Sequence, residues 1–294
     1  MEKLIDNRLM HILEYFGKLV RWLFLLLVLW IIWRVVQGIF GIGTGADRIA
    51  YLDESGKEIT SVPSLMYSNA KSIVVDGKLY ETRFGKEYRL KSLLHDVHSF
   101  YSVEDLKSGK LFICGMDQCY PDAPNSDAAE TSLYDVKSAC ASAGPRLNVA
   151  RCIPSLLLLR DGRVLIVGGM NPDGVSTSDA VEVYNPESNK VAMLGRLNEA
   201  RGGAGCIQLS EDKVAVIGGQ LKYHPSGLIQ TVTGTCEVLD LKTGQAKRAG
   251  SVFPCTEPTL VKDKQGNILV IGGYYLTRVM GDTRWKKGLD VFSP

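Results

Sequence analysis

The chain has 294 residues, of which 45% are apolar and 22% are charged. This is the composition of a folded protein of one or two domains, and it excludes a chain that is disordered throughout. The 34 basic and 32 acidic residues leave a formal charge of +2, which gives no electrostatic basis for a nucleic-acid partner.

The first strong pattern along the chain is an apolar stretch at residues 22–43. It begins as WLFLLLVLWIIW and continues past Arg34 to Gly43. Because a helix needs about 20 apolar residues to cross the hydrocarbon core, we expect a transmembrane helix here. An arginine at the centre of a bilayer costs about 3 kcal/mol, but its long side chain reaches an interface when the helix shifts or tilts. A cleaved signal peptide is the alternative, since Thr44, Gly45 and Ala46 offer small residues for cleavage.

Residues 1–21 carry apolar side chains at helical spacing, which predicts an amphipathic segment on the membrane surface. Lys3, Arg8, Lys18 and Arg21 precede the span. Positive residues collect on the cytoplasmic side of a span. The expected protein is therefore a single-pass signal-anchor protein with a cytoplasmic N-terminus. The remainder of the chain would lie in the periplasm or extracellular space.

Residues 44–77 are predicted to be a linker with irregular strands, and beyond them the sequence repeats. Apolar phrases that end in glycine recur as KLFICG (110–115), RVLIVGG (163–169), KVAVIGG (213–219) and NILVIGG (267–273), with the last three double glycines 50 and 54 residues apart. A second strand phrase follows each one: TSLYD (131–135), VEVYNP (181–186), CEVLDL (236–241) and LDVFSP (289–294). RLNVAR (146–151) and RLNEAR (196–201) precede two of the copies.

A unit of about 50 residues with four short strands cannot close its own core, so neighbouring units must stack. The double glycine, the second strand phrase and the arginine phrase recur in one order, and this pattern resembles kelch repeats. The resemblance implies an all-β fold, a kelch-type β-propeller at residues 78–294 with about four to five blade units. Residues 152–159 and 203–209 would be channel-lining strands, and residues 79–94 the third and fourth strands of a leading unit.

The last unit stops at Pro294 after its third strand. Two alternatives follow from the resemblance. An N-terminal strand completes the unit and closes a small ring, or the chain is the front part of a longer propeller.

The phrases His95-Asp96, TSLYD, GPRLNVAR and DGRVLIVGG are similar to the galactose oxidase family of copper radical oxidases. That family uses a cysteine cross-linked to a tyrosine, and the motifs would place these two residues at Ser99 and Ile153. Neither residue can form that radical cofactor, and the later histidine-bearing blades are not part of this chain. The resemblance therefore implies a shared architecture without the activity, and we expect no cofactor.

Other chemistry-bearing residues give weak signals. Cys114 and Cys119 could form a disulfide outside the cytoplasm. We expect buried free thiols at Cys140, Cys152, Cys206, Cys236 and Cys255. His95, Asp96 and His98 are too few for a metal site without a further ligand, and there is no nucleophile-elbow or phosphate-loop motif. We expect neither a catalytic residue nor a metal.

Long loops at residues 116–130, 170–179, 220–233 and 274–287 are the strongest functional signal, because loops of this length are uncommon without a function. The kelch arrangement places them on one face, together with Arg151 and Arg201. The last loop supplies aromatic and arginine side chains, the types enriched at binding hot spots. The candidate binding residues are Arg151, Arg201, Tyr274, Tyr275, Arg278, Arg284 and Trp285. The alternative for the two first arginines is structural, with bonds to carbonyl groups of the adjacent unit.

Together these features predict a membrane-anchored, extracytoplasmic kelch propeller that acts as a protein- or glycan-binding module. One alternative is an envelope carbohydrate-active enzyme, either a sugar epimerase or a galactose oxidase-like oxidase. Arg151, Arg201 and His98 would be its first candidate site residues. Another is the front fragment of such an enzyme.

Overall fold

The computed structural model of the chain describes residue 22 and residues 49–52, 72–75, 78–94, 102–115, 128–222, 231–263, 266–271, 274–276, 283–285 and 289–294. The chain divides into two units, Met1–Asp47 and Arg48–Pro294. In the first unit the single described residue is Trp22, which is helical and 64% exposed. The expected span at residues 22–43 otherwise lies outside the described residues. Within the described residues, no helix has the length and apolar character needed to cross a membrane.

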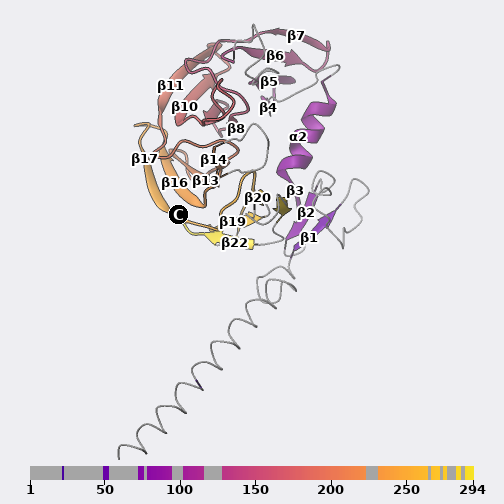
Figure 1. Cartoon of the computed structure of the whole chain (residues 1–294). Helices are drawn as coiled ribbons and strands as arrows, with labels where there is room; N and C mark the ends of the chain where they lie inside the picture. The colour runs from indigo at the N-terminus through magenta and orange to yellow at the C-terminus, as the bar shows by residue number, and fades with distance from the viewer. Residues whose placement is uncertain are drawn as a thin grey trace, which may run out of the picture. The chain divides into compact units, whose positions relative to one another are not determined.

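Four antiparallel sheets follow one another around a common centre in the second unit (Figure 1). The first contains β4 (Ser102–Asp105), β5 (Lys110–Cys114), β6 (Thr131–Asp135) and β7 (Cys140–Ala143). The second contains β8 (Ser155–Leu158), β9 (Val164–Val167), β10 (Ala180–Asn185) and β11 (Lys190–Arg196). The third contains β12 (Gly205–Gln208), β13 (Lys213–Ile217), β16 (Thr235–Asp240) and β17 (Ala246–Ser251). The fourth contains β18 (Thr259–Lys262), β19 (Ile268–Ile271) and β22 (Leu289–Phe292).

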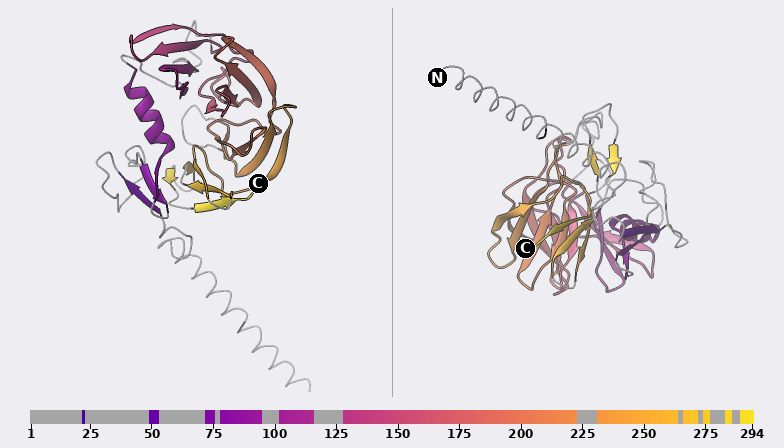
Figure 2. Two further views of the ribbon diagram at one scale, coloured as in Figure 1. Left: turned by 180° about the vertical axis from the view of Figure 1, so that it is seen from behind. Right: turned by 90° about the horizontal axis from the view of Figure 1, so that it is seen from below.

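The strands of each sheet run from the centre to the rim in chain order. The first strands, β4, β8, β12 and β18, are neighbours at the centre, and β7, β11 and β17 lie at the rim (Figures 1 and 2). This confirms that residues 152–159 and 203–209 contain innermost strands. Among the described strands, the last unit contains three, and β22 is the outermost of them. Two hairpins, β14 (Gln220–Lys222) with β15 (Thr231–Val232) and β20 (Tyr274–Leu276) with β21 (Thr283–Trp285), are inserted after second strands.

The paired glycines join each sheet to the segment that leads into the next. Gly169 N donates to Arg201 O at 3.0 Å, and Gly219 N donates to Cys255 O at 2.7 Å. Gly168 has a φ of +56°, and a Cβ on it would overlap the carbonyl oxygen of Arg201. Only glycine combines this backbone conformation with so close an approach of another chain segment. These glycines recur because the two described junctions, at Gly168–Gly169 and Gly218–Gly219, have the same geometry.

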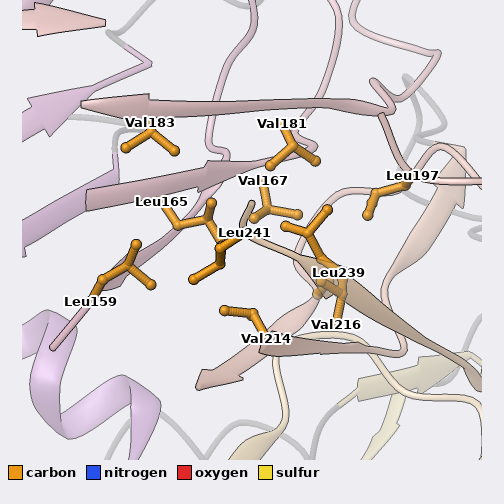
Figure 3. Close-up of a cluster of buried hydrophobic side chains, with 11 residues drawn as sticks. Leu159, Leu165, Val167, Val181, Val183, Leu197, Val214, Val216, Leu239 and Leu241 are labelled. Atoms are coloured by element: carbon orange, nitrogen blue, oxygen red, sulfur yellow. The ribbon is translucent and has the colours of Figure 1, made fainter. Parts of the chain in front are cut away.

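The apolar core lies between neighbouring sheets. Between the second and third sheets, Val167 and Val181 of one sheet share a buried cluster with Val214, Val216 and Leu239 of the other (Figure 3). Burying an aliphatic side chain of this size stabilises a fold by about 1.5–3 kcal/mol. No single sheet holds these contacts alone, as the repeat predicts.

The expectation of strands at residues 79–94 is wrong beyond β3 (Lys78–Glu81), because α2 spans Arg83–Ser92. Leu90 and Leu94, four residues apart and on one side of this segment, are buried against Leu111 and Ile113 of β5. The alternate residue Phe112 faces the second sheet instead. The helix thus covers the face of the first sheet that points away from the second sheet.

β1 (Ile49–Leu52), β2 (Ser72–Val75) and β3 form a separate three-stranded antiparallel sheet. Among the described strands none of these three joins the fourth sheet, whose order is β18-β19-β22. The described N-terminal strands therefore do not complete the last unit. Glu81 and Thr82, which link β3 to α2, line the same central cavity as residues 258–260 of the fourth sheet.

Candidate binding face and axial cavity

The loop after β9 and the hairpin after β13 lie side by side and are hydrogen-bonded to each other. Thr177 Oγ1 donates to Leu221 O at 2.9 Å, and Ser176 forms a backbone bridge with Lys222. Met170 and Gln220 are bridged to Cys152 and Gly202, which stand just before the inner strands β8 and β12. The long loops of the second and third sheets therefore form one continuous surface with the segments that lead into the inner strands.

The predicted loop at residues 274–287 contains a hairpin, which the sequence reasoning missed. Tyr274 pairs with Trp285, and Tyr275 pairs with Arg284. β20 lies next to β15 of the neighbouring hairpin, and the β20–β21 hairpin stands out from the sheets in Figure 2 (right view). Four of the five candidate residues in this loop are thereby brought together in two cross-strand pairs. Arg278 lies outside the described residues.

Arg151 and Arg201 are inside the protein. Both residues are 0% exposed. Arg151 donates to the carboxylate of Glu182, and Arg201 Nη2 donates to Glu237 Oε1 at 2.7 Å. Arg201 Nη1 also donates to Gly218 O at 2.7 Å. The structural alternative expected bonds to carbonyl groups of the adjacent unit, whereas Gly218 belongs to the same unit as Arg201. A binding role for the two arginines stays a prediction.

The sequence reasoning missed the acidic partners of the two arginines, although a signal for them was present. Glu182 and Glu237 hold the same place in the phrases VEVYNP and CEVLDL, which belong to the same two units as RLNVAR and RLNEAR. Asn148 Nδ2 donates to Glu182 at 2.9 Å, and Asn198 Nδ2 donates to Glu237 at 2.7 Å. Arg, Asn and Glu thus recur together as one hydrogen-bonded group in the second and third units, in which the Arg–Glu pair is buried and the Asn is exposed.

A cavity of about 250 Å³ lies at the centre, where the four inner strands begin. In antiparallel sheets of this order, the beginnings of the inner strands and the loops after the second strands share one end. The cavity is therefore at the same end of the molecule as the joined loops. Its lining comprises Glu81, Thr82 and Lys86 together with residues 102–104, 154–157, 204–206 and 258–260.

Glu104 and Lys86 are the charged pair of this cavity. Lys86 Nζ lies 2.6 Å from Glu104 Oε1, and the side chains are 40% and 4% exposed respectively. Burial raises the pKa of Glu104 above its ordinary value of 4.5, while the charge of Lys86 acts in the opposite direction. Nearby, Arg89 Nε donates to Glu81 Oε1 at 3.0 Å. The sequence reasoning missed this pair because α2 itself was unexpected.

The cysteines differ from the expectation at four positions. Cys114 is a free, buried thiol, so the expected bond between Cys114 and Cys119 is wrong. Cys152 is disulfide-bonded to a partner outside the described residues, rather than free. Cys140 is free but exposed. Cys206 is a partly buried thiol, and the expectation of buried thiols that form no disulfide is confirmed at Cys236 and Cys255.

The remaining candidate positions lie largely outside the described residues. This applies to His95, Asp96, His98 and Ser99. Ile153, the position that the galactose oxidase resemblance compares with a tyrosine, is described and has a φ of +40°. Within the described ranges, no group of three or more His, Cys, Asp or Glu side chains could hold a metal ion.

Comparisons with known proteins support the fold over part of the chain. No protein-family model matches the sequence. Over 63 residues the chain is 43% identical to galactose oxidase from Gibberella zeae, a stretch that covers 21% of this chain and 9% of that protein. The solved structure of YjhT superposes with a TM-score of 0.52 at 11% identity and covers 66% of this chain and 68% of that one. The short match and this fold likeness together suggest a galactose oxidase-like propeller.

Proposed function

We propose that this chain is a propeller-type binding module that captures a protein or glycan partner with its joined loops. The observation that carries the proposal is the connection of long loops from successive sheets, through the Thr177–Leu221 hydrogen bond and the Ser176–Lys222 bridge. A surface held in place by such bonds loses little conformational entropy on binding, which favours affinity.

The composition of the β20–β21 hairpin supports the same proposal. Its two strands carry Tyr274, Tyr275, Arg284 and Trp285 in adjacent cross-strand pairs. Tyrosine, tryptophan and arginine are the residue types that contribute most to binding at interfaces. Aromatic rings also stack against the apolar faces of sugar rings. The hairpin is therefore suited to either class of partner.

The proposal includes display of the module outside the cytoplasm, from a membrane segment at residues 22–43. The apolar stretch and the basic residues before it support this placement. The disulfide at Cys152 supports it independently, because structural disulfides persist in oxidising compartments.

Capture experiments with the full chain in detergent test the proposal. The triple variant Tyr275→Ala, Arg278→Ala and Trp285→Ala should lose at least about 90% of partner capture from envelope extracts and glycan arrays, since interface anchors dominate affinity. The matched control is Lys137→Ala with Arg160→Ala, two exposed residues in turns at the opposite end of the sheets. Unchanged capture by the triple variant would remove the hairpin from the proposal.

A second candidate function is a carbohydrate-active enzyme of the envelope. The short galactose oxidase match and the axial cavity with its buried carboxylate favour it. The test is incubation of the full chain with aldoses, followed by measurement of oxygen uptake and of anomer or epimer ratios by NMR. Turnover that Glu104→Gln abolishes would favour the enzyme. A chain that captures partners and leaves all sugars unchanged would favour the binding module.

A further inference from the structure

The axial cavity contains an ammonium group that is supplied by the chain itself. Lys86, on α2, directs Nζ to within 2.6 Å of Glu104 Oε1 on the inner strand β4. We propose that this cavity is a site for a small primary amine, whose ammonium replaces that of Lys86 on Glu104. The proposal goes beyond partner capture by the loops, since it concerns a different set of residues and a different ligand.

When Glu104 is ionised, a cation in this position stabilises its carboxylate. Its side chain is 4% exposed, and an ionised carboxylate without a partner is strongly disfavoured inside a protein. Among the described residues, Lys86 is the cation in direct contact with Glu104, and the charge of Arg89 acts on it from farther away while Arg89 is paired with Glu81. One positive charge therefore satisfies the cavity, whichever molecule carries it.

Lys86 is a cation that can be displaced. Its side chain is 40% exposed, in contrast to the buried carboxylate that it contacts. The flexible stem of a lysine allows the ammonium to move into water, where it is fully hydrated. The neighbouring Arg89 is held on Glu81 at 3.0 Å, so it does not have to leave its own partner during the exchange.

The walls of the cavity limit the size and type of amine. The lining is mixed: Leu156, Leu157, Leu260 and two prolines lie beside polar residues such as Thr82, Ser102 and Ser155. A volume of about 250 Å³ is below the usual range for drug-sized ligands. The site fits an amine with a short alkyl chain, whose carbon atoms pack on these walls while the ammonium contacts Glu104.

Competition with Lys86 sets the expected affinity. A group on a short tether has an effective concentration in the millimolar range. The concentration of a free amine must exceed the effective concentration of the tethered Lys86 ammonium before it displaces that group. The dissociation constant of the amine for the unaltered chain should therefore lie at about 1–100 mM. Removing the tethered ammonium should tighten binding, whereas a ligand that uses Lys86 as a donor would bind more weakly after the same change.

Ligand-observed NMR with ethylammonium as the probe tests the proposal on the full chain. We expect Lys86→Met to bind ethylammonium at least about tenfold more tightly than the unaltered chain, and Glu104→Gln to abolish binding. Tetramethylammonium, which has no N–H donor, should not compete. Equal or weaker binding by Lys86→Met, or retained binding by Glu104→Gln, would overturn the proposal. The loop variant Tyr275→Ala, Arg278→Ala, Trp285→Ala should bind ethylammonium normally, so the two proposals can fail separately.

A second measurement needs no substitution. Ethylammonium should accelerate amide hydrogen exchange in residues 86–94 of the unaltered chain, because it breaks the contact between α2 and β4. Tetramethylammonium at the same concentration is the control for ionic strength. Identical exchange in the two salts would also overturn the proposal.

Discussion

Arg201 and Glu237 form an ion pair at 2.7 Å with side chains that are 0% and 2% exposed. The arginine precedes the innermost strand of the third sheet and the glutamate lies on the third strand, so the pair ties the two parts of the sheet together. In the fourth sheet, Cys255 stands at the position of the arginine. The carbonyl of Cys255 accepts a hydrogen bond from Gly219 N, just as the carbonyl of Arg201 accepts one from Gly169 N. Asp290 there accepts from Phe253 N at 2.8 Å. The same backbone bond occurs in the third sheet, where Glu199 N donates to Glu237 Oε1 at 3.2 Å, so the fourth sheet keeps this bond without the arginine.

Removing one member of the pair should destabilise the fold strongly. Arg201→Met leaves Glu237 buried without its cation, and we expect the free energy of unfolding to fall by about 3–5 kcal/mol. The double variant Arg201→Met, Glu237→Leu should lose less free energy of unfolding than Arg201→Met alone, because it leaves neither charge of the pair buried. Urea unfolding followed by circular dichroism measures both values. A double variant as unstable as the sum of the two single ones would contradict this account.

The glycines at the sheet junctions provide a prediction with an internal control. Gly162 and Gly168 both have positive φ, but a Cβ on Gly162 meets no atom within 4 Å, whereas one on Gly168 would overlap Arg201 O. Gly162→Ala should cost about 1–2 kcal/mol, the strain of a left-handed residue. Gly168→Ala should cost about 1–3 kcal/mol more, because the overlap displaces the next segment. Equal melting temperatures for the two variants would contradict the close approach.

The pH dependence of stability should reveal the state of Glu104. Burial raises its pKa above 4.5 in the folded chain, so the folded state binds this proton more tightly than the unfolded state. Its contribution to stability is fully present below about pH 4.5 and is lost as the pH rises through the folded pKa. Relative to Glu104→Gln, the unaltered chain should lose stability over that interval. Denaturant titrations from pH 4 to 7 measure the free energy of unfolding of both chains. An unaltered chain that becomes more stable relative to Glu104→Gln as the pH rises would refute the prediction.

The cysteines should differ sharply in reactivity. Burial raises the pKa of the Cys114 thiol to about 12 and that of Cys236 to about 11, which suppresses the reactive thiolate. Cys140 is exposed. Mass spectrometry after brief iodoacetamide treatment of the folded chain should find Cys140 labelled well before the other two. Cys140→Ser should remove the fast phase, and prompt labelling of Cys114 would show that the first sheet opens readily.

The sequence predicted the stacked sheets because a repeated double glycine after an apolar strand indicates a repeated close approach of two backbone segments. It also placed Tyr274, Tyr275, Arg284 and Trp285 in one loop, although not as a hairpin. It did not predict α2, since Leu90 and Leu94 are too few apolar residues to distinguish a helix from a strand. The cavity pair was missed for the same reason. Lys86 and Glu104 are 18 residues apart and have no pattern in common, and only the packing of α2 on β4 brings them together.

Site-specific photo-crosslinking tests most directly where a partner binds. Benzoylphenylalanine is placed at Tyr275, in the β20–β21 hairpin, or at Lys137, in an exposed turn at the opposite end of the sheets. After irradiation of native membranes, the first chain should yield a discrete covalent adduct and the second should yield none. An adduct from position 137 alone, or equal adducts from both positions, would contradict capture by the joined loops.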